Sequence, residues 1–453
     1  MKKMEGKLMK KAVLFFLSCT LFVTALAGCG GSQDSGNDSS TDTGETTEAS
    51  DSGDGESTGE EEISGTITIA LTEDRVQYYE PVVEAFQEEY PDVEVELATS
   101  PDFTAMNQAA QAAHQAGDDY DIITVNHVDT MTFQKAGMLY PMYELAEQDG
   151  INFDDVFMGS LMDGCKVDGQ AWTVPTDTDV RIMAYNKELF EKYNLEYPET
   201  IEDMLACGEV MTQDGDYLFC NPLTSSTYQS TYEMGVFLKS MGGNLYVTDD
   251  DGNLTATIDT PEMQEYLEFV QQLMQYMPEN STTITGDETR NQFCSGNIGM
   301  YIFGPWEYGE MDIESLDFTL ELGLIPAGEA GSCSTSGGFQ LGIGSGTDNL
   351  SASWAFIKWL TSNPDQIAAF SGTNLPTIEA AYEEGDLASE KYDIFKQQLE
   401  TSSIPQAPVA NLSEVMDTFD SYWQNLLFGN MTPEEICSEA QTAVQELLDE
   451  NNE

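Results

Sequence analysis

The sequence predicts an α/β fold, and three features of residues 65–453 lead to this prediction. The first is a stretch between residues 65 and 125 with the periodicity of strand, helix, strand, helix and strand. The second is the spacing of these segments, which requires right-handed crossover connections and so a mostly parallel sheet. The third is a series of amphipathic helices in the later part of the chain.

The first elements follow from the pattern of apolar residues. Alternating apolar and polar residues predict strands over 65–71 and 93–97, and an apolar run predicts a third strand over 121–125. Between them, Pro81 is expected to open one helix, because proline suits the first turn. An Ala- and Gln-rich stretch that ends at a glycine predicts a second helix over 103–116.

Later elements are mostly helical. Apolar residues at helical spacing predict a helix over 262–277, and the capping-box sequence at 432–435 is expected to begin the last helix of the chain. The segments 245–248 and 254–257 read as a hairpin around an Asp-Gly turn at 249–253. That turn superficially resembles a calcium loop, but the glycine and the closing glutamate are not at the required positions.

Charge excludes several functions. The 453 residues contain 81 Asp and Glu against 16 Lys and Arg, which gives a formal net charge of −65. Such a surface repels phosphate backbones, so no nucleic-acid partner is expected, and the favoured ligand is neutral or cationic. His114 and His127 are the only histidines, too few for a histidine-built zinc site or a catalytic triad. Neither a metal nor another cofactor is expected.

The beginning of the chain predicts export. Five lysines within residues 1–11 precede the apolar stretch 12–28, the pattern of a secretory signal. The sequence Leu-Ala-Gly-Cys that ends at Cys29 resembles the lipobox of bacterial lipoproteins, which implies cleavage before Cys29 and lipidation of its thiol. An uncleaved anchor helix is the alternative. Residues 29–64 are then a lipidated cysteine followed by an acidic Ser-, Gly- and Thr-rich tether, expected to be disordered.

Ten stretches occur in an order that is specific, although each is weak alone. They are Phe86–Val95, Asp168–Pro175, Asp177–Arg181, Tyr185–Phe190, Phe293–Met300, Gly304–Trp306, Pro326–Gly328, Gly337–Phe339, Trp354–Leu360 and Leu375–Thr377. Together they resemble the extracellular solute-binding proteins of ABC importers, in the maltose-binding-like, carbohydrate-oriented family. The resemblance covers nearly all of residues 65–453.

The resemblance implies a two-lobed periplasmic-binding-protein-like (type II) α/β fold with an interdomain cleft and hinge crossings. The N-terminal lobe would comprise 65–176 and 338–371, and the C-terminal lobe 177–337 and 372–453. The chain would cross between the lobes near 176–181, 334–342 and 371–376.

The resemblance also implies ligand-binding residues. Trp306 occupies the family's Gly-Pro-Trp position and is expected to stack on a sugar ring, whose C–H face suits an aromatic wall. Asp177 and Asp179 lie on the first crossing, where their carboxylates can accept hydrogen bonds from sugar hydroxyls. Tyr228 and Phe339 are further cleft candidates. Gly338 lies in the glycine-rich second crossing, which reads either as a hinge or as a turn beside a strand.

Other candidates follow from the fold class itself. Ligands of α/β sheets bind at the carboxyl ends of the strands. Asn126, His127 and Asp129 follow the third predicted strand, and the loop from Thr72 to Arg75, with Glu73 and Asp74, follows the first.

The sequence therefore predicts a lipid-anchored receptor, not an enzyme, that captures a carbohydrate outside the cell by hinge closure and delivers it to an ABC permease. It would contact the membrane through the lipid only and act as a monomer. A cationic solute such as a polyamine, a tethered carbohydrate-active enzyme and a receptor for a sensor kinase remain alternatives. Six cysteines besides Cys19 and Cys29 allow fifteen pairings, and the sequence does not choose among them.

Overall fold

The computed structural model describes most of the chain beyond the tether. The described residues are 63–158, 161–212, 215–223, 229–248, 253–383, 386–401, 409 and 411–452. Residues 61–453 form a compact unit of their own. The predicted signal segment, Cys29, most of the tether, Tyr228 and the turn at 249–252 lie outside the described residues.

The first lobe is built on a five-stranded sheet with the order β2-β1-β3-β15-β6. Its strands are β1 (Gly65–Thr72), β2 (Val93–Ser100), β3 (Ile122–Asn126), β6 (Thr173–Pro175) and β15 (Phe339–Ile343). β1 pairs in parallel with β2 and β3, as predicted from the alternation of strands and helices. β15 is antiparallel to both β3 and β6, so the sheet is mixed.

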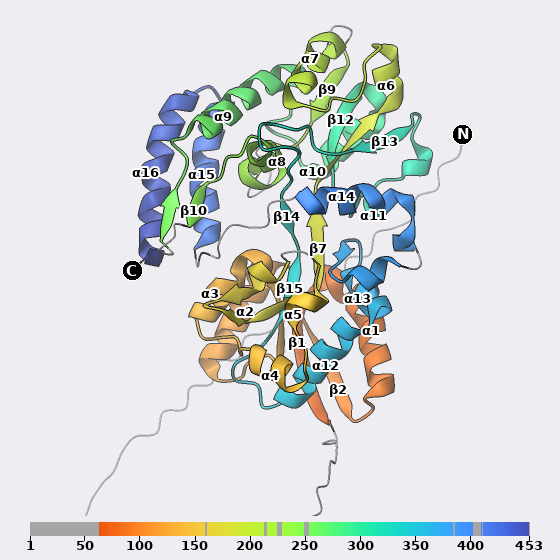
Figure 1. Ribbon diagram of the computed structural model, residues 1–453, viewed down its shortest axis with the longest axis vertical. Helices are drawn as coiled ribbons and strands as arrows, with labels where there is room; N and C mark the ends of the chain where they lie inside the picture. The colour runs from red at the N-terminus through yellow and green to blue at the C-terminus, as the bar shows by residue number, and fades with distance from the viewer. Residues whose placement is uncertain are drawn as a thin grey trace, which may run out of the picture. The chain divides into compact units, whose positions relative to one another are not determined.

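Helices cover both faces of this sheet (Figure 1). One face packs against α1 (Val76–Glu89), α12 (Leu350–Ser362) and α13 (Pro364–Ser371). The other packs against α2 (Phe103–Ala116) and α3 (Thr130–Lys135). The short helices α4 (Tyr143–Gln148) and α5 (Phe153–Val156) and the hairpin of β4 (Lys166–Val167) and β5 (Gln170–Ala171) complete the lobe.

The start of α1 differs from the prediction. The helix begins at Val76, five residues earlier than expected, and contains Pro81 in its interior. Proline in a helix interior removes one backbone hydrogen bond. The first turns are nevertheless held because Tyr79 is fully buried. Its ring packs at a tilt against Phe370 with ring centroids 4.0 Å apart, and its hydroxyl shares a 2.7 Å hydrogen bond with Thr124. Tertiary burial thus outweighs the local preference.

The second lobe contains a four-stranded sheet with the order β13-β8-β12-β9. Its strands are β8 (Ile182–Asn186), β9 (Tyr217–Cys220), β12 (Ile298–Phe303) and β13 (Leu320–Gly323). Every residue of β12 is buried, because the sheet has an apolar core on each face.

The helices of the second lobe form most of its volume. The larger core contains α6 (Lys187–Lys192), α7 (Ile201–Met211), α8 (Gly235–Ser240), α9 (Pro261–Leu273), α15 (Leu412–Leu427) and α16 (Pro433–Asn452). The remaining helices are α10 (Gly286–Gln292), α11 (Glu307–Glu310) and α14 (Asp393–Thr401).

Two local predictions for this lobe are confirmed. β10 (Tyr246–Thr248) and β11 (Leu254–Ala256) pair antiparallel, as the hairpin predicts. The capping box is present before α16, where the Glu435 amide donates to Thr432 Oγ1 at 3.2 Å and the Thr432 amide donates to Glu435 Oε2 at 2.9 Å.

Three segments pass between the two sheets, and they pair with one another. β7 (Asp177–Val180) connects β6 of the first sheet to β8 of the second, and β14 (Ser336–Gly337) connects β13 to β15. With β16 (Leu375–Pro376) they form a small antiparallel sheet with β7 in the middle. These are the three crossings that the sequence predicts, whereas the exact lobe bounds stay predictions.

Several chemical features are absent from the described part of the chain. No helix there is long and apolar enough to span a membrane. No three His, Cys, Asp or Glu side chains of the described ranges come together as a metal site. The six cysteines for which the sequence left the pairing open are free thiols: Cys165, Cys207, Cys220, Cys294, Cys333 and Cys437.

Candidate functional site

The crossing strand β7 presents a buried carboxylate to the first lobe. Asp177 Oδ2 lies 2.6 Å from Nη2 of Arg75, which follows β1. Asp177 Oδ1 accepts a 2.7 Å hydrogen bond from Asn374 Nδ2 and a 3.3 Å hydrogen bond from the Phe339 amide. Burial raises the pKa of Asp177, and the Arg75 charge opposes that rise. The carboxylate is therefore fully engaged within the crossing region.

Arg75 also contacts aromatic rings. Its guanidinium carbon lies 4.2 Å from the centroid of the Phe339 ring. Phe339 in turn stacks with Phe103, with ring centroids 4.7 Å apart and 6° between the ring planes. A planar cation and two rings thus meet where β15 leaves the crossing.

A second arginine occupies the other end of β7. Arg181 Nη1 is paired with Asp179, and Nη2 lies 3.0 Å from Glu233 Oε1. Arg181 Nε donates to the same Glu233 oxygen at 3.3 Å. The Arg181 side chain is 7% exposed, so these are well-shielded ion pairs. Counted with Arg75 and Asp177, the region holds two arginines and three carboxylates.

Arg181 contacts two aromatic rings as well. Its guanidinium carbon lies 4.6 Å from the Tyr232 centroid and 5.0 Å from the Trp306 centroid, within cation–π range. Trp306 follows β12 and is partly exposed. Its ring also lies so close to Gly304 that a Cβ added there would be 2.1 Å from the ring. Only glycine leaves room for the indole at this place.

His127 brings the first lobe into contact with Tyr232. His127 Nε2 lies 2.9 Å from the Tyr232 hydroxyl, which also lies 2.9 Å from the Ser336 carbonyl oxygen. Because a carbonyl can only accept, the hydroxyl donates to Ser336 and accepts from Nε2–H of His127. His127 Nδ1 is buried without a hydrogen-bond partner among the described groups. Burial lowers the pKa of His127 to about 4, so the imidazole is neutral near pH 7.

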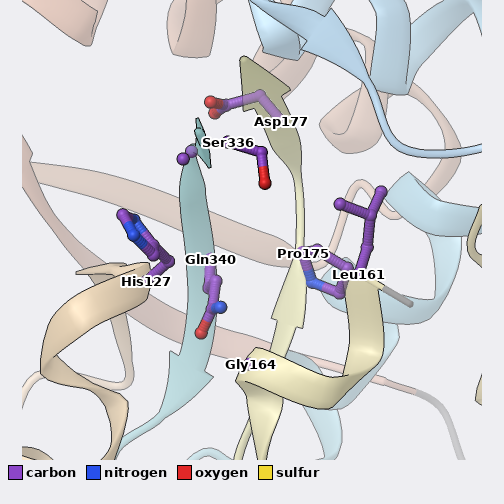
Figure 2. A pocket seen from close by; sticks show the side chains of 9 residues that line it. His127, Leu161, Gly164, Pro175, Asp177, Ser336 and Gln340 are labelled. Atoms are coloured by element: carbon purple, nitrogen blue, oxygen red, sulfur yellow. The ribbon is translucent and has the colours of Figure 1, made fainter. Parts of the chain in front are cut away.

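A small cavity lies beside these groups, between β15 and β7 (Figure 2). Its volume is about 20 Å³, which is room for one water molecule. Gln340 lines it and accepts a 2.6 Å hydrogen bond from Thr130 at Oε1. The cavity therefore belongs to the crossing region and is too small for a sugar.

The predicted site residues divide into four groups. Six of them meet around the crossings: Asp177, Asp179, His127, Gly338, Phe339 and Trp306. Two others, Asn126 and Asp129, lie at or just after the end of β3 and make local hydrogen bonds. Asn126 accepts a hydrogen bond from the Val128 amide at 3.3 Å, and Asp129 accepts one from Asn107 at 3.0 Å. Burial raises the pKa of Asp129.

Glu73 and Asp74 are exposed and belong to the short helix η1 (Glu73–Arg75). It is the next residue, Arg75, whose side chain reaches the crossing. Tyr228 lies outside the described residues.

Gly338 has a structural role that the sequence only hinted at. Its φ is +128°, and a Cβ there would lie 2.2 Å from the Asp177 carbonyl oxygen. The glycine therefore lets β14 and β7 approach closely, which favours a fixed crossing over a swivel at this residue.

Sequence reasoning missed four residues of the cluster, Arg181, Tyr232, Glu233 and Asn374, and named Arg75 only as the end of the candidate loop 72–75. The two arginines carried a usable signal, because basic residues are scarce in this chain and both stand next to predicted cleft segments. Tyr232, Glu233 and Asn374 carried none.

Two α/β lobes, three paired crossings and a polar and aromatic cluster at those crossings define the architecture of a solute receptor. The chain belongs to the bacterial extracellular solute-binding protein family, whose model matches residues 70–367.

Individual relatives are similar at low identity. The maltotriose-binding protein of Pyrococcus abyssi is 25% identical over 315 residues, which cover 67% of this chain and 64% of the relative. The arabinooligosaccharide-binding protein of Halalkalibacterium halodurans is 26% identical over 276 residues, 58% of this chain and 59% of the relative. The chain thus spans about three fifths of the length of these relatives.

A solved structure extends the comparison to the fold. The GacH receptor of Streptomyces glaucescens GLA.O, solved without ligand and in complex with acarbose, is 24% identical and superposes with a TM-score of 0.71. The superposition covers 85% of this chain and 99% of that receptor. The two-lobed fold predicted from the sequence is confirmed.

Proposed function

We propose that this protein binds a neutral carbohydrate, in particular an oligosaccharide, between its lobes and delivers it to the permease of an ABC importer. The observation that carries the proposal is the cluster around Arg181, in which the partly exposed indole of Trp306 and the carboxylates of Asp179 and Glu233 contact the same guanidinium. An aromatic face next to hydrogen-bond acceptors matches a sugar ring, which has a C–H face and a rim of hydroxyls.

The charges of the cluster favour a neutral ligand over an anion. A phosphate or carboxylate ligand is usually held by arginine. Both arginines here are already paired with carboxylates, and the cluster contains one acid more than it contains arginines. An anionic ligand would have to displace these acids in a chain of net charge −65.

The relatives support the oligosaccharide class. Two of them are named for maltotriose and for arabinooligosaccharides, and the GacH receptor was solved with acarbose. A ligand that contacts Trp306 of the second lobe and the His127 region of the first favours the closed arrangement by its additional contacts there.

The beginning of the chain supports a place outside the cell. A signal segment over 1–28 would be removed and Cys29 lipidated, and the tether to residue 64 would hold a monomeric receptor away from the membrane surface. Incorporation of labelled fatty acid that is lost in Cys29→Ala is the expected result. Incorporation that survives this substitution would contradict the anchor.

A cationic solute is the second candidate. The excess carboxylate of the cluster and the net charge of −65 both favour a polyamine.

A thermal-shift screen of the detergent-solubilised full chain separates these readings. The panel contains maltotriose, arabinotriose, spermidine and glycerol 3-phosphate. A ligand at 100 times its dissociation constant adds about 2.7 kcal/mol to native stability. We expect stabilisation by one neutral oligosaccharide series, without release of reducing ends. Stabilisation by spermidine alone would make the second candidate correct, and stabilisation by glycerol 3-phosphate alone would overturn both.

A further inference from the structure

We propose that Arg181 is a positioning residue, which fixes the indole of Trp306 and links it through Tyr232 to His127 of the first lobe. The inference deepens the proposed function, on which it rests for the meaning of the indole as a ligand platform. It assigns to Arg181 the orientation of an aromatic ring rather than a contact with the ligand.

The first step concerns the guanidinium itself. Three of its bonds go to two carboxylates, Asp179 on β7 and Glu233 on the segment Gln229–Glu233. A planar fork held by two carboxylates has little freedom to rotate, so it presents its faces in fixed directions. Arg181 is therefore a rigid support, and this support comes from the crossing strand that joins the lobes.

The second step concerns the indole. Trp306 follows β12 and is not held by a strand or by a long helix, because α11 has four residues only. Its ring lies 5.0 Å from the guanidinium of Arg181 and close against Gly304. Gly304 has no side chain and so leaves room for the indole, and the planar guanidinium of Arg181 makes a cation–π contact with it.

The third step concerns the other lobe. Tyr232 lies 4.6 Å from the same guanidinium, and its hydroxyl bonds His127 in η2 (His127–Asp129) and the Ser336 carbonyl on β14. Val128, the next residue in η2, packs against the large core of the second lobe. A movement of η2 relative to the second lobe must therefore displace the Tyr232 hydroxyl or break its bond to His127.

Together the contacts form a chain from His127 through Tyr232 and Arg181 to Trp306. In this arrangement the closed contact between the lobes and the orientation of the indole depend on each other. A ligand that stacks on Trp306 stabilises the contact made by His127, and that contact prepares the indole for the ligand.

The test uses the full chain labelled with 5-fluorotryptophan and observes ¹⁹F resonances without any ligand. The chain has five tryptophans, and Trp306→Phe assigns the resonance of interest. Arg181→Lys keeps the charge between the two carboxylates but removes the planar fork. Tyr232→Phe and His127→Phe keep aromatic rings and remove the hydrogen bond between the lobes. Tyr276→Phe, on the core of the second lobe, is the matched control.

We expect Arg181→Lys, Tyr232→Phe and His127→Phe each to shift the Trp306 resonance by more than its linewidth and to leave the other four tryptophan resonances in place. In the control Tyr276→Phe, the Trp306 resonance should not shift. The double variant of His127 and Tyr232 should give the shift of Tyr232→Phe alone, because Tyr232→Phe already removes the hydrogen bond to His127. An unmoved Trp306 resonance in Arg181→Lys would overturn the positioning role. If Arg181→Lys does not fold, Tyr232→Phe decides, since it leaves every charge in place.

Failure of this inference is distinct from failure of the proposed function. The measurement involves no solute. A Trp306 resonance that shifts in Arg181→Lys therefore supports the inference whatever the ligand is. A carbohydrate that binds equally well without Trp306 would instead remove the ligand platform from the proposed function.

Discussion

Arg75 Nη2 and Asp177 Oδ2 lie 2.6 Å apart, and the two side chains are 6% and 0% exposed. Arg75 follows the first strand of the first lobe, whereas Asp177 begins the strand that crosses to the second. The pair therefore ties the first lobe to the crossing sheet. The Asp177 carboxylate therefore has a structural role that does not depend on contact with a ligand.

The first prediction concerns this pair. Arg75→Met leaves the Asp177 carboxylate buried without its partner, which should lower the free energy of unfolding by about 3–5 kcal/mol. Urea denaturation of the full chain measures this. The exposed pair of Lys192 and Asp216 is the control, because Lys192 is 49% exposed and Lys192→Met should cost less than about 1 kcal/mol. Equal losses in the two variants would show that burial of the pair is irrelevant.

The second prediction concerns acid. Burial lowers the pKa of His127 from 6.5 to about 4, opposed by Asp179 and assisted by Arg181. Between these values the unfolded chain binds more protons than the folded one, so this contribution to stability is present above pH 6.5 and is lost as pH falls toward 4. The loss is about 3 kcal/mol at most.

The comparison of wild type with His127→Gln isolates this contribution, because the many carboxylates titrate in both proteins. The difference between their free energies of unfolding should shrink from pH 7 to pH 4.5. A difference that does not vary with pH would mean that His127 is charged or exposed in the folded state.

The third prediction concerns Gly338. Gly338→Ala combines a φ of +128° with a Cβ 2.2 Å from the Asp177 carbonyl oxygen, so it should cost more than about 1 kcal/mol. Gly286→Ala is matched to it, since no heavy atom lies within 4 Å of the added Cβ and α10 begins there. Calorimetry should show a lower melting temperature for Gly338→Ala only. An unchanged value for both would refute the close approach of β14 and β7.

The fourth prediction concerns thiols. The six described cysteines are free, and burial raises the pKa of Cys165 to about 12 and the pKa of Cys207 and of Cys437 to about 11. Thiolate is the reactive form, so these groups should react slowly in the native protein and all six should react once it is unfolded in urea. A reagent such as dithionitrobenzoate counts them. Four or fewer thiols in the unfolded lipidated protein would indicate a disulfide.

The fold was accessible from the sequence where local patterns act alone. Alternating apolar residues predict β1 and β2 and an apolar run predicts β3, and each pattern reflects burial against the helices of the first lobe. The capping box at Thr432 needs only residues three positions apart. The prediction that the helix begins at Pro81 was wrong, because a rule for helix starts uses local sequence only. The burial of Tyr79, which holds the earlier turns, is a tertiary effect.

The candidate site was only partly accessible for a related reason. Trp306, Asp177 and Asp179 carried a family resemblance, and His127 followed a strand. Their partners are distant in sequence: His127 and Tyr232 are 105 positions apart, and Asp177 and Asn374 are 197 positions apart. No local pattern marks such a pair. The roles of Asp177 and Asp179 in ligand binding stay predictions, since both carboxylates are engaged by arginines.

The most direct test of the central claim is calorimetric titration of the full chain and of Trp306→Ala with the oligosaccharide that the thermal screen selects. The wild type should bind one molecule of sugar per chain. Loss of the indole should weaken binding at least about tenfold, which corresponds to about 1.4 kcal/mol for the lost aromatic contact. Trp354→Phe, in the core of the first lobe, should bind as the wild type does. Affinity of Trp306→Ala within twofold of the wild type would contradict a carbohydrate site at the lobe crossings.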